Sequence, residues 1–330
     1  MKALLCTEHG PPSSLALADV DAPPLSAGTV RIEVHAAGVN FPDVLIIQGK
    51  YQFQPPLPFS PGGEVAGVVT ELGQGVTEFS LGDRVLGLPG WNGFAEQVVV
   101  PAAKCFSVPD DMPLEVAAGF GMTYGTVAHA LLQRGQLQAG ETLLVHGATG
   151  GVGTAAIEIG RCLGASIIAT GGKAEKLAVL SEAYGLADVI DTTAETPLKD
   201  AVKKLTAGRG ADVIFDPVGG DVFEQSLRCI NWNGRLLVVG FASGTIASAR
   251  ANLLLLKGSA VVGVFWGAFT LKEPERNAEN FRQLFAWYAE GKLNPRISHR
   301  FSLAEGGQAI DALMRREVIG KAIVVVREAT

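Results

Sequence analysis

The chain has 330 residues, of which 48% are hydrophobic, so it is long enough for two domains with sizeable cores. Its 27 basic and 33 acidic residues give a net charge of −6, and no basic run is interleaved with aromatics, which argues against a nucleic-acid partner. The four cysteines show no paired spacing and indicate free thiols in a reducing cytosol. The first ten residues hold too few apolar side chains for a signal peptide, so we expect a cytoplasmic protein.

The sequence pattern changes once along the first 255 residues. Up to about residue 120, short β-type runs such as VRIEVHAAGV (30–39) and EVAGVVTELG (64–73) are separated by turn residues, which predicts mostly antiparallel β structure. From about 121 to 255, apolar strands alternate with amphipathic helices, which is typical of βαβ units in a parallel sheet. We predict strands at 142–147, 166–170, 188–190, 212–217 and 235–241, and helices at 151–163, 173–184, 198–205 and 220–229.

The last part of the chain contains the longest apolar stretch, at 251–269. Lys257 and several glycines interrupt it, which favours a buried strand and loop over a membrane span. A helix around 277–291 and a last strand at 321–326 follow. We expect this strand to return to the first domain, which makes that domain discontinuous in sequence.

The segment TLLVHGATGGVGT (142–154) places a glycine-rich turn between a strand and a helix, the context of a dinucleotide-binding loop. The unpaired N–H groups and the positive dipole at a helix start favour a pyrophosphate there. Gly150 is expected to make the tight turn, Gly151 to let the backbone approach a phosphate, and Gly153 to let the helix pack closely. The strict G-x-G-x-x-G pattern is not met in this register, and a turn without a ligand is the alternative. The predicted phosphate-binding residues are Ala148, Thr149, Gly150, Gly151, Val152 and Gly153.

The end of the second predicted strand distinguishes NADPH from NAD. An acidic side chain about 20 residues after the loop would bind the ribose 2′-hydroxyl of NAD, but this strand ends IIATGGKAEK without an acid. Gly172 leaves room, and Lys173 and Lys176 bring positive charge, which favours the 2′-phosphate of NADPH. The alternative is that both lysines are ordinary solvated residues in the first turns of a helix.

Seven ordered stretches carry a family resemblance over essentially the whole chain, among them AAGVNFPDVLIIQGKY (36–51), PGGEVAGVV (61–69) and HGATGGVGTAAIEIGRCLGA (146–165). The chain resembles the zinc-free medium-chain dehydrogenases/reductases of the NADPH:quinone oxidoreductase family. The resemblance implies an α/β fold: a GroES-like β domain (1–120 plus 266–330), an inserted Rossmann domain with a doubly wound parallel sheet (121–265), and an active-site cleft between them. It also implies a homodimer.

The resemblance also bears on metal binding. Zinc alcohol dehydrogenases of this superfamily have a cysteine ligand where this chain has Asn40, and a histidine ligand where it has Gly63. The region of the third ligand, AAGFGMTYG (117–125), contains no cysteine. Because a catalytic zinc needs about three converging N, S or O ligands, we expect no metal site.

The resemblance assigns roles to further residues. Asn40, Asp43 and Tyr51 are the candidates for catalysis on the acceptor side, although Asn40 could only cap a turn and Tyr51 could be an exposed loop aromatic. A second tyrosine of some relatives is Leu45 here, and a tyrosine that often holds the 2′-phosphate is Thr192. The further candidates for cofactor binding are Asn40, Thr123, Gly240, Phe241, Ala242, Phe265 and Trp266.

Three functions fit these observations. The leading one is hydride transfer from NADPH to a quinone, which stabilises its own charge without a Lewis acid. The second is an enoyl-thioester or enone reductase, whose product charge spreads into an enolate. The third is a protein that holds NADPH without turnover. The small-molecule acceptor would be a quinone or an enone.

Overall fold

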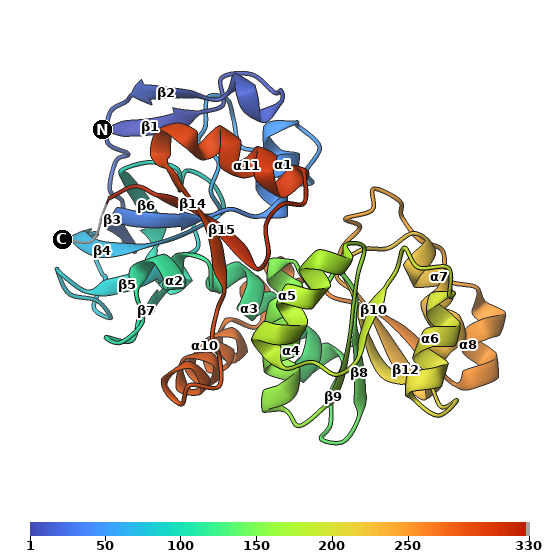
Figure 1. Cartoon of the computed structure of the whole chain (residues 1–330). Helices are drawn as coiled ribbons and strands as arrows, with labels where there is room; N and C mark the ends of the chain where they lie inside the picture. The colour runs from blue at the N-terminus through green and yellow to red at the C-terminus, as the bar shows by residue number, and fades with distance from the viewer. Residues whose placement is uncertain (328–330) are drawn as a thin grey trace. The chain divides into compact units, whose positions relative to one another are not determined.

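Residues 1–327 are described by the computed structural model, in which they divide into two units (Figure 1). Met1–Met122 and the chain from Pro295 onward form the first unit, and Thr123–Asn294 form the second. The second crossing between the units lies at 294/295 and not at the 265/266 boundary expected from the sequence. This difference arises because residues 266–294 pack within the second unit.

A largely antiparallel sheet makes up most of the first unit. Its strands follow the order β14-β15-β3-β4-β5-β7, and β6 pairs with the first half of β3. β15 pairs antiparallel with the end of β3, so the last strand lies in the first unit, as the sequence predicted. The strands are β3 (Thr29–Gly38), β4 (Glu64–Leu72), β5 (Arg84–Gly87), β6 (Gln97–Pro101), β7 (Cys105–Ser107), β14 (Ile297–Ser302) and β15 (Lys321–Val325).

Smaller elements complete the first unit. A hairpin of β1 (Lys2–Leu5) and β2 (Ala16–Asp19) forms a separate two-stranded sheet, and backbone hydrogen bonds join β1 to residues 94–96. The helices are α1 (Phe41–Ile47), α2 (Leu114–Ala118) and α11 (Gly306–Met314), with 3₁₀ turns at Pro12–Ser14, Ala102–Lys104 and Leu303–Glu305. The core follows from the two-residue period of β3, where Val30, Ile32 and Val34 are fully buried on one face.

The second unit is built on a parallel sheet with the strand order β10-β9-β8-β11-β12-β13, in which every neighbouring pair is parallel. Counted from β8, this is the order 3-2-1-4-5-6 of a Rossmann sheet, which confirms the predicted fold class. The strands are β8 (Thr142–Val145), β9 (Ser166–Gly171), β10 (Val189–Asp191), β11 (Ala211–Asp216), β12 (Ile230–Val238) and β13 (Ala260–Gly263).

Helices connect these strands. α3 (Gly121–Ala128) begins at the end of the first unit and continues into a π-helical turn at His129–Arg134. The others are α4 (Gly151–Cys162), α5 (Ala174–Tyr184), α6 (Leu198–Leu205), α7 (Asp221–Cys229), α8 (Ala251–Lys257), α9 (Trp266–Lys272) and α10 (Pro274–Ala289). The sequence predicted the bounds of α6 as observed and those of α4, α5 and α7 to within one residue.

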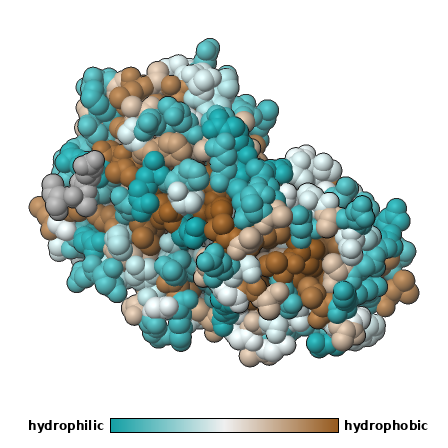
Figure 2. Space-filling view, viewed as in Figure 1, coloured by the Kyte–Doolittle hydropathy of each residue, from teal (hydrophilic) through white to brown (hydrophobic). Residues whose placement is uncertain are grey.

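The apolar stretch at 251–269 differs from its prediction as a buried strand and loop. Its first part is helix α8, where Leu255 is 82% exposed and Leu256 is 71% exposed, and its middle is the edge strand β13. Figure 2 shows hydrophobic residues at the surface in the region of α8. Hydrophobicity alone did not separate a buried run from an exposed one. Across residues 1–327, helices with the length and hydropathy required to cross a membrane do not occur.

Residues 266–294 stay with the second unit because three sets of contacts hold them there. The indole of Trp266 covers Gly125, where an added Cβ would lie 2.5 Å from Cζ2 of the tryptophan. On α10, the amide of Asn280 exchanges hydrogen bonds of 2.9 and 3.1 Å with Gln133. Glu158 Oε2 accepts hydrogen bonds from Tyr124 Oη (2.8 Å) and from the N–H of Asn294 (3.0 Å).

The close approach of α4 to the preceding loop generates a stability prediction. A Cβ at Gly153 would lie 2.3 Å from the carbonyl oxygen of Gly147 and 2.6 Å from Ala148 Cα. We expect Gly153→Ala to lower the free energy of unfolding of the cofactor-free protein by about 1–3 kcal/mol in urea denaturation. Gly150→Ala is the matched control, because its Cβ would meet only Gly147 O, at 3.4 Å, and its φ is −82°. Equal stability of the two variants would contradict the packing role of Gly153.

Candidate functional site

The loop between β8 and α4 forms a tight turn closed by a hydrogen bond of 3.0 Å from Gly150 N to Gly147 O. The left-handed residue of this turn is Gly147, with φ +57°, whereas Gly150 has φ −82°. Gly150, which was expected to make the tight turn, closes it through its N–H, and the positive φ belongs to Gly147, the first residue of the turn. Gly150 also forms the N-cap of α4.

The first turn of α4 presents backbone donors. Thr154 N makes the first hydrogen bond of the helix, to Gly150 O, and the described structure gives no acceptor to the N–H groups of Gly151, Val152 and Gly153. Gly151 and Val152 are partly exposed, as is Thr149, whereas Gly153 is buried. Ala148 is fully buried, and its N–H donates to Thr170 O. Unpaired N–H groups on a three-turn helix suit an anion such as a pyrophosphate.

The strand order reverses between β8 and β11, and ligands of open α/β sheets bind beyond the carboxyl ends of the strands at such a point. The loop after β11 is fixed by Asp216, whose Oδ1 accepts hydrogen bonds from Val218 N and Gly219 N at 2.8 and 2.9 Å. The loop after β12 lies against it, because Ala242 N donates to Pro217 O. The predicted residues Gly240, Phe241 and Ala242 therefore lie at this carboxyl edge.

The end of β9 contains the predicted 2′-phosphate residues. Gly172 and Lys173 are exposed and Lys176 is half-buried, and Lys173 forms the N-cap of α5. An added Cβ at Gly172 would lie 3.7 Å from Thr192 Oγ1, so the threonine in the place of the family's tyrosine borders this position. Gly172 and Lys173 thus follow the end of β9 with Thr192 close to Gly172, and no acidic residue lies in 171–174.

The remaining predicted residues of the second unit differ in accessibility. Phe265 is 48% exposed, but Trp266 is buried and its Nε1 donates to Asn277 Oδ1 at 3.0 Å. Thr123 is also buried. The side chain of Trp266 therefore packs in the unit, and its N–H already has an acceptor.

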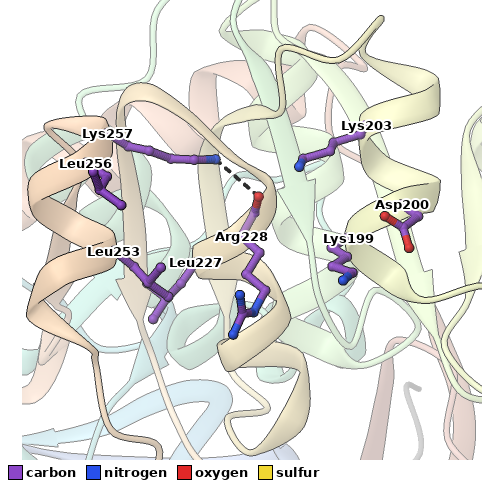
Figure 3. A pocket seen from close by; sticks show the side chains of 8 residues that line it. All are labelled: Lys199, Asp200, Lys203, Leu227, Arg228, Leu253, Leu256 and Lys257. Carbon is purple, nitrogen blue, oxygen red and sulfur yellow. Dashed lines mark hydrogen bonds between the residues drawn. The ribbon is translucent and has the colours of Figure 1, made fainter.

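A separate hollow of about 250 Å³ lies between α6, α7 and α8 (Figure 3) and contains none of the predicted site residues. Lys203, Arg228 and Lys257 come from the last turns of helices, where they complement the negative end of the helix dipole, whereas Lys199 lies in the first turn of α6. Lys257 Nζ also donates to the carbonyl oxygens of Arg228 and Ile230. These contacts give Lys257 a structural role.

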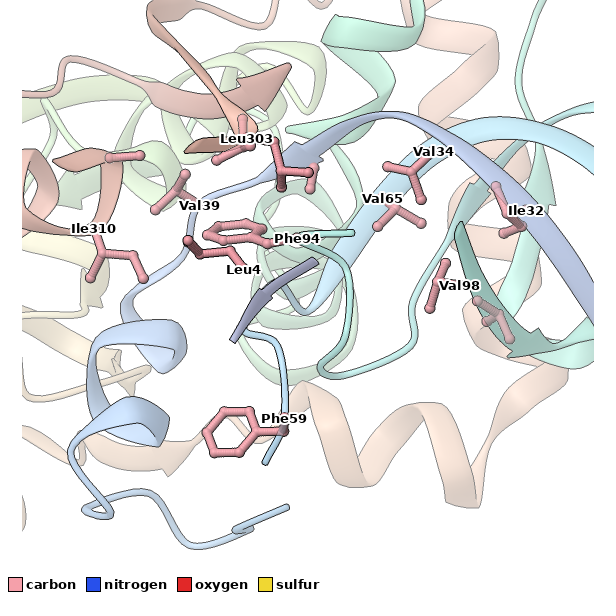
Figure 4. Packing of buried hydrophobic residues seen from close by; sticks show 14 of the residues in the cluster. Leu4, Ile32, Val34, Val39, Phe59, Val65, Phe94, Val98, Leu303 and Ile310 are labelled. Atoms are coloured by element: carbon pink, nitrogen blue, oxygen red, sulfur yellow. The ribbon is translucent and has the colours of Figure 1, made fainter. Parts of the chain in front are cut away.

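In the first unit, Asn40 lies in a buried polar network, and its neighbour Val39 belongs to the hydrophobic core (Figure 4). Asn40 Nδ2 donates to Glu64 Oε1 at 2.8 Å. Lys321 Nζ donates to Asn40 Oδ1 (2.7 Å), Val39 O (2.9 Å) and Glu64 Oε1 (2.9 Å). The network thus joins the start of α1 to the first residues of β4 and β15.

Asp43 holds the backbone on both sides of α1. Its Oδ2 accepts the N–H of Asn40 at 2.7 Å, as in a capping box, and its Oδ1 accepts the N–H of Gly62 at 2.9 Å. Burial raises the pKa of Asp43 to about 6, although both hydrogen bonds and the charge of Lys321 oppose this shift. The side chain is 1% exposed, so these contacts place it as a support for Asn40 and the loop at Gly62.

Tyr51 is partly buried against the core of the first unit and meets Phe53 edge to face, with ring centroids 6.4 Å apart. Burial, and next the charge of Asp43, raises the pKa of the Tyr51 hydroxyl. Tyr51 is therefore more enclosed than an exposed loop aromatic, whereas Phe53 is 59% exposed.

Sequence reasoning missed Glu64 and Lys321 as members of this network. Each is a charged residue at the start of an apolar strand, EVAGVV and KAIVVV, which is a sign of a buried charge. Their pairing was hidden because 257 positions separate them. Within residues 1–327, histidine, cysteine and acidic side chains do not form a group of three able to hold a metal ion.

Comparisons with known proteins cover the whole chain. Residues 26–110 match the alcohol dehydrogenase GroES-like domain, and residues 151–290 match the zinc-binding dehydrogenase family. Quinone oxidoreductase-like protein 2 homolog of Nematostella vectensis is 40% identical over 98% of this chain and 88% of its own length. The structure of Escherichia coli quinone oxidoreductase complexed with NADPH is similar with a TM-score of 0.90 and 27% identity, over 99% of this chain and 100% of that one. Reducing polyketide synthase PKS1 of Cochliobolus heterostrophus is 31% identical over 91% of this chain, which corresponds to 12% of the synthase.

Proposed function

The chain belongs to the quinone oxidoreductase-like family of medium-chain dehydrogenases/reductases, and on this premise we propose that it transfers hydride from NADPH to a quinone without zinc. As a member of this family it is an NADPH-dependent oxidoreductase. The observation that carries the proposal is the first turn of α4. It lies where the strand order of the sheet reverses, and its N–H groups can bind an anion.

The polar network of the first unit favours a metal-independent reaction. A catalytic zinc would need about three ligands, usually with thiolate or imidazole among them. Here the oxygens of Asn40, Glu64 and Val39 already surround the ammonium of Lys321 at 2.7–2.9 Å. The donor set therefore suits a lysine and does not fit a zinc ion.

Without a Lewis acid, the acceptor has to stabilise the charge that it receives. NADPH, when bound, supplies the hydride from C4 of its nicotinamide. A quinone that gains this hydride becomes an aromatic hydroquinone anion, and a proton from water completes the hydroquinone. We propose that Asn40 and Tyr51 position the reactants, that Asp43 supports Asn40, and that Thr123, Phe265 and Trp266 shape the nicotinamide end.

The lysines after β9 generate a prediction about the cofactor. Lys173→Glu with Lys176→Glu should weaken NADPH binding at least about tenfold and leave NADH binding unchanged, because charge-assisted hydrogen bonds to the 2′-phosphate are lost. Fluorescence titration measures both affinities. Lys203→Glu with Lys204→Glu, on the exposed side of α6, changes the net charge equally and should leave the preference intact. An unaltered preference for NADPH in the first variant would mean that other residues bind the 2′-phosphate.

The match to a reducing polyketide synthase favours one second candidate, an enone or enoyl-thioester reductase. Rates of NADPH oxidation with 1,4-benzoquinone, 9,10-phenanthrenequinone, 2-cyclohexenone and crotonyl-CoA separate the two. We expect kcat/KM to be at least about tenfold higher for the quinones, since they need the least help with charge. A higher value for crotonyl-CoA or cyclohexenone would establish the second candidate, and NADPH binding without oxidation would point to a protein that only holds the cofactor.

Dialysis against a strong chelator should leave the activity intact.

We also propose that two copies of the chain associate through the exposed apolar surface at α8. Trp232, which borders Gly258 at the end of α8, is 67% exposed, and Leu255 and Leu256 of α8 are exposed as well. β13, the edge strand, offers unpaired backbone groups beside this surface. Light scattering after size exclusion should give the mass of a dimer, and Leu255→Glu with Leu256→Glu should give that of a monomer. Leu81→Glu, at a residue 66% exposed in the first unit, is the control that should remain dimeric.

A further inference from the structure

The imidazole of His146 lies fully buried one residue after the end of β8 and connects further elements of the second unit. Its Nδ1 lies 2.9 Å from Thr170 Oγ1, near the end of β9, and its Nε2 lies 2.7 Å from Ser226 Oγ on α7. The backbone N–H of His146 donates to Phe215 O on β11 at 3.0 Å. His146 thus contacts the strands on both sides of β8 and the helix that follows β11.

The partners of this imidazole determine which nitrogen carries its hydrogen. Ser226 Oγ donates its own hydrogen to Val222 O at 2.6 Å, so it can only accept from Nε2. Burial lowers the pKa of His146 and so favours the neutral ring, although the charge of Asp216 opposes this shift. A neutral ring with its hydrogen on Nε2 has an acceptor at Nδ1, and the hydroxyl of Thr170 donates there.

Thr170 is held at two of its atoms. Its carbonyl oxygen accepts the N–H of Ala148 at 2.9 Å, and its hydroxyl donates to His146. One hydrogen bond would allow the end of β9 to turn about it, whereas two bonds to different atoms restrict this rotation. The regular pairing of β8 with β9 ends before this point, at Val145 and Ala169. The two contacts of Thr170 therefore continue the connection between the strands beyond their ladder.

This connection lies between two segments that the dinucleotide would contact. The pyrophosphate loop (147–150) leads into the N–H groups at the start of α4. The 2′-phosphate segment (171–173) follows Thr170 directly and ends with Lys173. Both phosphate groups belong to the adenosine half of NADPH, where covalent bonds fix their spacing. Both are therefore bound well only when the two segments keep their alignment.

We propose that His146 and Thr170 are positioning residues for cofactor specificity. In this proposal, the bond from the hydroxyl of Thr170 to His146 Nδ1 holds the 2′-phosphate segment in alignment with the pyrophosphate loop. The inference rests on the proposed binding of NADPH. NADH lacks the 2′-phosphate, so its binding does not depend on this alignment. The imidazole has no exposed surface, so it acts through Thr170 and not by touching the cofactor.

Removal of one hydroxyl on either side of the imidazole separates this role from a purely structural one. Thr170→Val keeps the shape of the side chain but removes the donor. We expect the ratio of the NADH to the NADPH dissociation constant to fall about fivefold in this variant, through weaker NADPH binding. Thr170→Ser keeps the donor and should keep the ratio. Ser226→Ala is the matched control, which should unfold at lower urea concentration but keep the ratio. Fluorescence titration measures the dissociation constants.

The outcomes of these titrations are distinct. An unchanged ratio in Thr170→Val would overturn the proposal, and so would an equal fall in Ser226→Ala, which would indicate a general loss of packing. A wild-type protein without a preference for NADPH would overturn it together with the assignment of Lys173 and Lys176. Failure of the wild type to bind either dinucleotide would instead remove the proposed function, and this inference with it.

A mutant cycle tests whether His146 acts through Thr170. His146→Leu should reduce the ratio to the same extent as Thr170→Val, and the double variant should show no further fall. Reductions that add in the double variant would overturn the proposal.

NMR of the wild-type protein with isotope-labelled histidine tests the same contact without any substitution, so it applies even if a variant does not fold. The imidazole of His146 should carry a hydrogen on Nε2 and none on Nδ1. NADP⁺, which would contact both segments, should shift the Nδ1 resonance more than NAD⁺ does. The opposite tautomer, a cationic ring or equal shifts with the two ligands would overturn the proposal.

Discussion

The buried charge of Glu64 is the constraint on which the first unit depends. A carboxylate without solvent contact is very costly unless a cation and hydrogen bonds compensate it. The cation is Lys321, the first residue of β15, which reaches Glu64 at the start of β4 only when β15 pairs with β3. The return of the chain to its first sheet therefore adds β15 to that sheet and also brings the ammonium of Lys321 to the buried carboxylate of Glu64. The same carboxylate accepts a hydrogen bond from the N–H of Met122, in the first turn of α3, the helix that leads into the second unit.

Backbone geometry has the corresponding role in the second unit. Parallel strands place their following loops at one edge, and the reversal of strand order between β8 and β11 leaves room there. The start of α4 meets this edge with N–H groups that a negatively charged group could use, while the close packing of Gly153 on Gly147 and Ala148 holds the helix in place. Lys173 and Lys176 follow the end of β9, and under the proposed function their charge favours NADPH over NADH.

The sequence predicted those features that depend on neighbouring residues. The strand, turn and helix from 142 to 162 are local, and α6 could be delimited because Pro197 precedes it and its apolar residues recur with a helical period. The positive φ of Gly147 was not foreseen, because a run of glycines does not reveal which one has positive φ. The leucines of α8 were expected to be buried, since hydropathy does not indicate whether a helix faces a core or the surface. The network around Asn40 could not be derived, because its members are 24 and 281 positions away in the chain.

The nature of the cation at Glu64 connects this network to the proposed chemistry. A zinc ion with an open coordination position can bind a substrate oxygen and draw charge from it. The ammonium of Lys321 directs its three N–H groups at oxygens of the protein, so it has no comparable position for a substrate. Its charge is largely used to balance Glu64. A protein built in this way can orient a hydride donor but gives little help to a developing alkoxide, and under the proposed function this favours acceptors that delocalise the added electrons themselves. The same reasoning places the specificity for a quinone in the electronic structure of the acceptor, while the protein contributes the alignment of the two reacting carbon atoms.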